Sequence, residues 1–294
     1  MRLAILSDIH ANLLAMEAVL ADAEAHHVDG FAVAGDLITD GPDTVEVLKR
    51  VRSLQCPVIM GNREDYILRY RNGGKPAWDG SLQMAAVLWA NKSIGDEDFC
   101  YISTLPEQVV VELDCGQSLR VVHGSPFSMY DLLKPHQDMA AVEKSALAVQ
   151  EQVLVFGHNH IQWSGMVHGR LLLNPGSVGV HFNGECKAEY AILTCEDGRL
   201  SVELKRVPYN FAALERRLET SGLMAAAPVW TRITFESVKD GQNHNLHFLD
   251  DAHRVMREEG IPPGLIPNHI WKRVAAKWWE KMGWGPGLGM TTTD

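Results

Sequence analysis

Residues 2–10 read RLAILSDIH, and they begin the pattern that decides the fold. The run RLAIL at 2–6 is short, apolar and without alternation, which predicts a buried strand. Asp8 and His10 follow directly after it. Asn12 then precedes apolar residues at helical spacing and is a candidate helix cap. Polar side chains at the end of a buried strand are candidates for a functional site.

The order of strand, polar loop and helix recurs over the first 60 residues. Residues 30–35 (GFAVAG) predict a strand ending at Asp36, residues 43–53 a helix, and residues 57–60 (PVIM) a strand ending at Gly61-Asn62. This alternation predicts an α/β fold with a parallel sheet covered by helices.

More strands are predicted beyond Pro106. The segments 108–114 and 118–123 read as a hairpin, and further strands are expected at 153–157, 170–173, 189–195 and 199–206. The inventory favours two sheets between helical layers. Helices are expected within 64–105 and at 211–219, 251–258 and 268–282.

The chain is expected to divide into a first domain at 1–206 and a C-terminal extension at 207–294. The extension is mainly helical in pattern, and its last residues, 283–294, are expected to be loose. Three roles remain open for it: a cap over the active site, a contact in a homo-oligomer, or an enlargement of the core.

Composition narrows the class of protein. The chain has 294 residues, of which 46% are hydrophobic and 22% charged, as in soluble globular proteins. A net charge of -10 argues against a nucleic-acid partner. No uncharged run approaches the ~18 residues that span a membrane, and no signal peptide is recognisable, so the cytoplasm is the expected location. The five scattered cysteines predict free thiols rather than a disulfide framework.

Seven polar side chains lie at the ends of predicted strands: Asp8, His10, Asp36, Asn62, His123, His158 and His160. Carboxylate, imidazole and amide groups are mixed N/O ligands that suit Mn, Fe, Zn, Co or Ni. Seven ligands exceed what one ion needs but suit two divalent ions that share a carboxylate. Such a pair activates water and clamps the oxygens of a phosphoryl group.

Each of these residues also has a structural interpretation. Asp8 could cap a helix, Asp36 and Asn62 could be turn residues, and His123 could be a buried histidine. The pair His158 and His160 is harder to explain in this way. The whole set, in this order and always at strand ends, favours a metal site.

The ordered set resembles the calcineurin-like metallophosphoesterase superfamily, whose pattern is D-x-H, G-D, G-N, H-G and G-H-x-H. The stretches SDIHANLLAMEAVL, GDLITDGPDTVEVLK and NPGSVG also resemble motifs of its small bacterial and archaeal phosphodiesterase branch. The resemblance covers residues 1 to about 205.

The resemblance implies a four-layer α/β/β/α sandwich with a dinuclear metal site at one edge. One metal would be held by Asp8, His10, Asp36 and His160, and the other by Asp36, Asn62, His123 and His158. Asp36 would bridge the two ions, for which Mn is favoured, and a metal-bridging hydroxide would attack phosphorus. The implied enzyme is a metal-dependent phosphodiesterase or phosphatase that acts on small phosphoesters or nucleotides, with Asn62 and His123 among its catalytic residues.

Two other functions remain open. One is a nuclease, which the acidic charge and the lack of a basic groove disfavour. The other is a non-catalytic scaffold, because one relative, a subunit of a trafficking coat, has lost parts of the ligand set. All seven ligand positions are present here.

Arg63 departs from the family pattern, since many members have a histidine directly after G-N. An arginine can stabilise phosphate oxygens, but its pKa above ~12 makes it a poor proton donor. Arg63 is therefore a candidate catalytic and substrate-binding residue, and the alternative is a surface ion pair with Glu64 or Asp65. Asn12 is a candidate substrate ligand or a helix cap. Ser177, in NPGSVG, is expected to support the metal loops.

Overall fold

A computed structural model of the chain describes residues 1–284, whose strands form two sheets. The first sheet has the spatial order β2 (Gly30–Val33), β1 (Arg2–Leu6), β8 (Ala188–Glu196) and β9 (Arg199–Val207). The second has the order β3 (Gln108–Glu112), β4 (Ser118–Val122), β5 (Val153–Val155), β7 (Arg170–Asn174) and β6 (Trp163–Val167). The expected looseness of 283–294 concerns mainly residues 285–294, which lie outside the described residues.

The position of strand β1 between two apolar layers explains why residues 3–6 are all apolar. Ala4 and Leu6 pack on the helical side of the first sheet, whereas Leu3 and Ile5 pack between the two sheets. Both faces of this strand are therefore buried. It pairs in parallel with β2, as the alternation of strands and helices predicted, and antiparallel with β8, so the first sheet as a whole is mixed.

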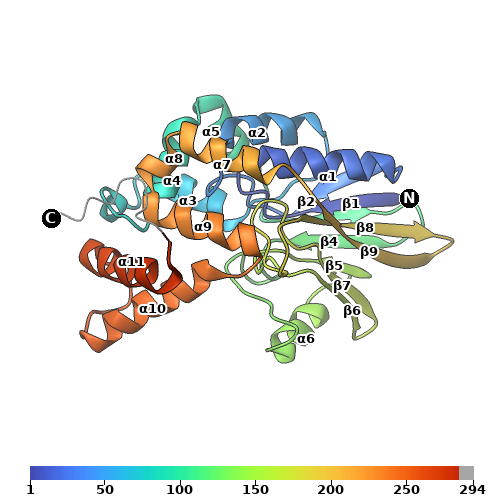
Figure 1. Cartoon of the computed structure of the whole chain (residues 1–294). Coiled ribbons are helices and arrows are strands. Elements are labelled where there is room, and N and C mark those ends of the chain that lie inside the picture. Colours follow the sequence, from blue (N-terminus) through green and yellow to red (C-terminus); the bar gives the residue numbers. More distant parts are fainter. Residues whose placement is uncertain (285–294) are drawn as a thin grey trace.

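Helices cover the outer faces of both sheets (Figure 1). Helices α1 (Leu13–Ala25) and α2 (Thr44–Ser53) lie over the first sheet, and α6 (Met139–Leu147) lies over the second. Val142 and Ala146 of α6 pack with Leu154 and Leu172 of the second sheet. This arrangement confirms the α/β/β/α sandwich.

The remaining helices of the described chain cluster at the end of the sandwich away from the N-terminus (Figure 1). They are α3 (Asn62–Arg71), a 3₁₀ helix at Pro76–Trp78, α4 (Ala85–Ser93), α5 (Asp96–Thr104), α7 (Phe211–Thr220), α8 (Leu223–Ala226), α9 (Pro228–Asp240), α10 (His244–Glu258) and α11 (Asn268–Met282). No helix within residues 1–284 is long and apolar enough to cross a membrane.

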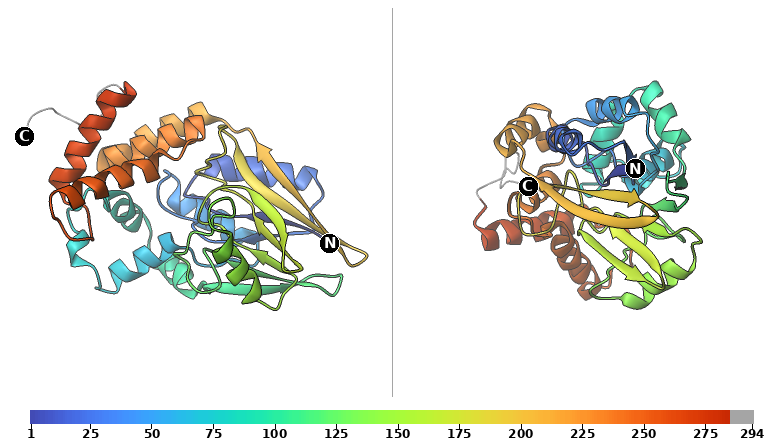
Figure 2. Two further views of the ribbon diagram at one scale, coloured as in Figure 1. Left: turned by 90° about the horizontal axis from the view of Figure 1, so that it is seen from below. Right: turned by 90° about the vertical axis from the view of Figure 1, so that its right-hand side faces the viewer.

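The C-terminal helices have an apolar cluster of their own. Trp271 and Phe248 are fully buried in it, with ring centroids 4.8 Å apart. Ala86 and Val180 of the preceding chain join the same cluster. Figures 1 and 2 show α10 and α11 at the end of the molecule opposite the N-terminus. The mainly helical extension is confirmed, and the domain boundary at residue 206 stays a prediction.

Several element predictions need correction. Residues 57–60 form no strand, and only Val58 makes a bridge, to Val33. Pro57 lacks an N–H group, and the N–H group of Met60 donates to Pro106 instead of a neighbouring strand. The sequence reading also missed β6, α6, α8 and α9 and began α10 at residue 251 rather than at His244.

The prediction that the cysteines are free thiols is wrong for one pair. Cys115, in the turn between β3 and β4, forms a disulfide with Cys195 near the end of β8. The two residues are 80 positions apart in sequence, but they lie on opposite sheets with Cα atoms 6.1 Å apart. Sequence spacing cannot reveal such a contact between sheets. Cys56, Cys100 and Cys186 are free.

The aromatic cluster yields a test of stability. Phe248→Ala should lower the free energy of unfolding by about 3–5 kcal/mol, because it leaves a cavity among packed rings. The matched change Phe127→Ala, at a side chain that is 54% exposed and contacts the Lys144 ammonium through its ring face, should alter it by less than about 1 kcal/mol. Urea unfolding followed by circular dichroism measures both values. Similar losses in the two variants would contradict a tightly packed C-terminal cluster.

Candidate metal centre

The loops at one edge of the sandwich bring the seven predicted ligands together. Asp8, His10 and His160 form one group, and Asp36, His123 and His158 form a second. Within each group the potential ligand atoms all lie within 4.8 Å of one another. Oδ1 of Asn62 lies 3.1 Å from His123 Nε2, beside the second group.

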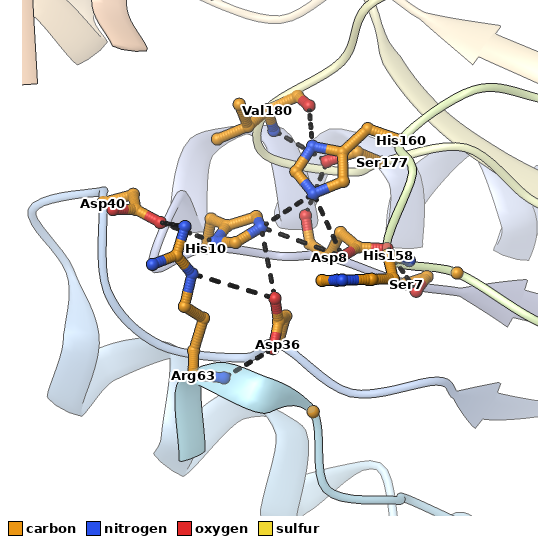
Figure 3. A network of polar contacts seen from close by, with 12 residues as sticks. Ser7, Asp8, His10, Asp36, Asp40, Arg63, His158, His160, Ser177 and Val180 are labelled. Atoms are coloured by element: carbon orange, nitrogen blue, oxygen red, sulfur yellow. Dashed lines mark hydrogen bonds and ion pairs between the residues drawn. The ribbon is translucent and has the colours of Figure 1, made fainter. Parts of the chain in front are cut away.

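The first group has its ligand atoms directed at one point (Figure 3). The Nε2 atoms of His10 and His160 are 3.2 Å apart. Oδ1 of Asp8 lies 3.2 Å from His160 Nε2 and 3.8 Å from His10 Nε2. All three side chains are at most 10% exposed.

Asp36 belongs to the second group but also reaches the first, because each of its two oxygens faces a histidine of a different group. Its Oδ2 is 3.7 Å from His10 Nε2, and its Oδ1 is 3.4 Å from His123 Nε2. The N–H group of Arg63 also donates to Oδ1, at 2.9 Å, from the start of α3. This is the placement that a bridging carboxylate requires.

The far nitrogens of the imidazoles are held by the protein. His123 Nδ1 lies 2.8 Å from the carbonyl oxygen of Ala34, and His160 Nδ1 contacts that of Val180. A carbonyl only accepts hydrogen bonds, so Nδ1 carries a proton in both rings, and in the neutral form of each ring Nε2 presents a lone pair. Anchoring of this kind is characteristic of histidines that bind metals.

The donor set fits divalent cations. If Nδ1 carries the ring proton, the Nε2 atoms of His10 and His160 are both acceptors, and two acceptors at 3.2 Å cannot hydrogen-bond to each other. Among the described residues, the buried Asp8 Oδ1 also has no hydrogen-bond donor. A cation between these atoms would satisfy all three.

The pKa values of Asp36 and His158 are consistent with ligand chemistry. Burial alone would raise the pKa of Asp36, but the neighbouring His123 and His10 lower it to about 2. Burial and the charge of His123 lower the pKa of His158 to about 4. At pH 7 the carboxylate is therefore ionised and this imidazole neutral, the forms that bind metals. Burial alone would lower the pKa of His123, but Asp36 raises it to about 10, so this ring has to lose a proton when it binds a metal.

The backbone of the ligand loops is unusual. Asp8, His10, Asp36, His158 and His160 all have positive φ angles, between 48° and 66°. Left-handed backbone is disfavoured for residues other than glycine and persists only where the surroundings enforce it. The loops are therefore held in place by other contacts.

The NPGSVG loop supplies some of those contacts, as expected for Ser177. Its Oγ donates to the carbonyl oxygen of Asp8 at 2.8 Å and accepts from the N–H group of Val180 at 2.8 Å. Gly179 approaches so closely that a Cβ atom there would lie 1.9 Å from the carbonyl oxygen of Ile9. Only glycine fits at this crossing.

Sequence reasoning missed a second support, the fully buried Glu64. Its carboxylate accepts hydrogen bonds from the N–H groups of Asp36, Leu37, Ile38 and Gly61, at 2.8–3.3 Å. It thereby joins the loop of Asp36 to the start of α3. Burial and the nearby Asp36 raise its pKa to about 7. A glutamate three residues after Gly61 was the available signal, as part of a capping box.

Sequence reasoning also missed Asp40 and Trp230. Oδ2 of Asp40 lies 3.1 Å from His10 Nδ1, and its Oδ1 accepts a 2.7 Å hydrogen bond from Trp230 Nε1. Asp40 looked like an ordinary turn residue, and nothing in the sequence linked Trp230 to the site.

Arg63 lies inside the site rather than at the surface. Its Nη2 is 3.1 Å from Asp40 Oδ2, and its Nε is 3.9 Å from Asp36 Oδ2. The alternative of an ion pair with Glu64 or Asp65 does not match these contacts.

Asn12 has the contacts of a helix cap. Its Oδ1 accepts from the N–H group of Ala15, and its Nδ2 donates to the carbonyl oxygen of Gly179. The side chain is 2% exposed, so these contacts favour capping over substrate binding.

A cavity of about 420 Å³ opens over the candidate ligands. Asp36, Asn62, Arg63, His158 and His160 line one side of it. The other walls are largely apolar and include Trp163, Phe182, Trp230, Leu246 and Leu249. Since the last three belong to α9 and α10, the C-terminal helices form part of the cavity wall.

Comparison with known proteins identifies the class. Residues 1–198 match the calcineurin-like phosphoesterase superfamily domain, and the chain belongs to this family of phosphoester hydrolases. The family uses divalent metals, which agrees with the two clusters of potential ligands.

Individual proteins that are similar to this chain share 26–28% of their aligned residues with it. An uncharacterised protein of Methanocaldococcus jannaschii is 28% identical over 71% of this chain and 88% of its own length. A symmetrical bis(5'-nucleosyl)-tetraphosphatase of Pectobacterium carotovorum is 28% identical, over 52% of each chain. The structure of a metallophosphoesterase from Sphaerobacter thermophilus is 26% identical, with a TM-score of 0.63 over 80% of this chain and all of the other.

The contacts of Glu64 give a prediction. Glu64→Ala should lower the free energy of unfolding by at least about 3 kcal/mol, because four buried N–H groups lose their acceptor. Thermal and urea unfolding measure the loss. Glu107→Ala, at an exposed glutamate, is the matched control and should be neutral. Equal stability of the two variants would show that Glu64 does not hold the loops together.

Proposed function

We propose that the protein is a dinuclear-metal phosphoesterase that hydrolyses small organic phosphoesters, either phosphodiesters or nucleotides. The observation that carries the proposal is the position of Asp36, which directs one carboxylate oxygen toward each group of candidate ligands. In this proposal Asp8, His10, Asp36 and His160 hold one ion, and Asp36, Asn62, His123 and His158 hold the other. Mn²⁺ is the favoured ion.

Two divalent cations, when bound, activate a water molecule for attack on phosphorus and stabilise the charge on the phosphoryl oxygens. The chain supplies the remaining functions. Asp36 orients both groups of ligands, and the neutral His158 serves as a ligand without first losing a proton. The guanidinium of Arg63 faces the cavity and binds a phosphate oxygen in the substrate.

The shape of the cavity supports a substrate with an organic group attached to phosphorus. A volume of about 420 Å³ far exceeds what a phosphate group fills, and the apolar walls favour an aromatic or other apolar substituent. The similarity to a bis(5'-nucleosyl)-tetraphosphatase supports a nucleotide as that substituent. The net charge of -10 makes a long nucleic acid a poor substrate.

The compartment and the oligomeric state stay predictions: a cytoplasmic protein, with the C-terminal helices as a candidate contact in a homo-oligomer. The Cys115–Cys195 disulfide is unusual for a reducing compartment. Titration of free thiols in the purified protein therefore tests the expected location, because three thiols per chain indicate that the disulfide forms and five indicate that it does not.

The metal site is tested by Asp36→Asn. Wild-type protein supplied with Mn²⁺ should carry two ions per chain and hydrolyse bis-p-nitrophenyl phosphate, and a chelator should abolish the activity. The variant should bind fewer ions and lose more than about 100-fold in kcat/KM, because the shared ligand is gone. Elemental analysis and a chromogenic assay measure these quantities.

Asp65→Asn is the matched control, because this carboxylate pairs with Arg69 outside the candidate ligand set. It should keep both the metal content and the rate. A wild-type protein without bound metal, or full activity in Asp36→Asn, would refute the proposal.

The arginine at position 63, where many members of the family have a histidine, leads to a prediction about leaving groups. Since a guanidinium does not donate a proton efficiently, kcat/KM should fall steeply from p-nitrophenyl to alkyl esters. Arg63→His should flatten this dependence by introducing a proton donor. Arg63→Ala should raise KM about tenfold or more through loss of a charged hydrogen bond to phosphate. Steady-state kinetics on a series of esters measures both effects, and an unchanged leaving-group dependence in Arg63→His would exclude the proton-donor argument.

A further inference from the structure

One buried carboxylate outside the candidate ligand set, that of Asp40, contacts three parts of the molecule. Its Oδ2 lies 3.1 Å from Arg63 Nη2 and 3.1 Å from His10 Nδ1, a close contact outside hydrogen-bond geometry. Its Oδ1 accepts a 2.7 Å hydrogen bond from Trp230 Nε1. One carboxylate thus connects a candidate metal ligand, a cationic residue of the cavity and a C-terminal helix.

The loop that carries Asp40 is fixed against the loop that carries His10 (Figure 3). A Cβ atom on Gly41 would lie 2.3 Å from the carbonyl oxygen of His10, so the two backbones touch. The N–H group of Asp43 donates to the carbonyl oxygen of Ala11 at 2.9 Å. The position of the Asp40 carboxylate is therefore tied to that of the His10 ring.

Trp230 is fixed from the other side. Its indole lies in α9 and is 9% exposed. Its ring centroid is 6.2 Å from that of Trp271, in the cluster formed by the C-terminal helices. The packing of these helices therefore determines where the indole N–H group meets Asp40.

Arg63 depends on the same carboxylate. Among the described residues, its Nε has no hydrogen-bond partner, and its closest ionic contact is Asp40, at 3.1 Å. The next carboxylate is that of Asp36, at 3.9 Å. Without Asp40, the guanidinium would turn toward Asp36 and compete with a cation for that ligand.

We propose that Asp40 is a positioning residue through which the C-terminal helices set the orientation of His10 and Arg63. The proposal rests on the proposed function for the roles of those two residues. Residues that orient a metal ligand through its far nitrogen change metal affinity without touching the metal. The C-terminal helices, beyond the part of the chain that matches the family, would then contribute to the metal site as well as to the cavity wall.

The test compares Asp40→Asn, Trp230→Phe and the double variant. Trp278→Phe is the matched control, since it removes an indole hydrogen bond to Asp251 within the C-terminal helices. Calorimetric titration of chelator-treated protein with Mn²⁺ measures metal affinity independently of catalysis. The values of kcat and KM for bis-p-nitrophenyl phosphate are measured in parallel, and circular dichroism verifies folding.

Asp40→Asn should weaken Mn²⁺ binding about 10–100-fold and raise KM. Trp230→Phe keeps an aromatic ring but loses the hydrogen bond, and should weaken Mn²⁺ binding about threefold to tenfold. The double variant should bind Mn²⁺ no more weakly than Asp40→Asn alone, because both changes break one connection. Trp278→Phe should stay within about twofold of the wild type.

Wild-type Mn²⁺ affinity in Asp40→Asn, or equal losses in Trp230→Phe and Trp278→Phe, would overturn the proposal. If Trp230→Phe fails to fold, the affinity of Asp40→Asn still decides it. A wild-type protein that binds Mn²⁺ but hydrolyses no ester would refute the proposed function alone, because the affinity differences still test the positioning role. A wild-type protein that binds no divalent ion would refute both.

Discussion

Three carboxylates, those of Asp8, Asp36 and Asp40, lie buried around the imidazole of His10. Burial of ionised carboxylates is unfavourable unless positive charge or hydrogen-bond donors surround each one. Asp40 has Arg63 and Trp230, whereas Asp8 and Asp36 each have one oxygen that accepts hydrogen bonds and otherwise face imidazole nitrogens. Cations between these groups would supply the missing charge, so metal binding and stability of the fold are expected to be coupled.

The sequence was informative where a residue type and its position in the pattern pointed to the same role. Each candidate ligand follows an apolar run, and ligands of mixed N/O type are rarely gathered for another reason. The strands that precede Asp8, Asp36 and His123 could be recognised from their short apolar runs. The loop that contains Ser177 was also interpreted correctly as a support, because a tight glycine-containing turn restricts where it can lie.

Other features depended on contacts that no local pattern encodes. Glu64 and Asp40 resemble ordinary polar residues of a helix start and a turn, and only the fold reveals what they contact. Helix α9 was missed because Thr231, Thr234 and Ser237 are buried together with its apolar residues, which obscures an amphipathic pattern. The Cys115–Cys195 pair arises only when the two sheets pack together.

Part of the cavity wall lies in a different stretch of the chain from the candidate ligands. Trp230, Leu246 and Leu249 follow the segment 1–198 that defines the family, whereas the metal groups lie within it. Exchange of residues 228–249 between homologous genes would therefore reshape the cavity, and an exchange that retains Trp230 would also keep its hydrogen bond to Asp40 beside the donor atoms. A lineage could diversify the ligands of this cavity in this way by recombination downstream of the codons for residues 1–198, which include the candidate metal ligands.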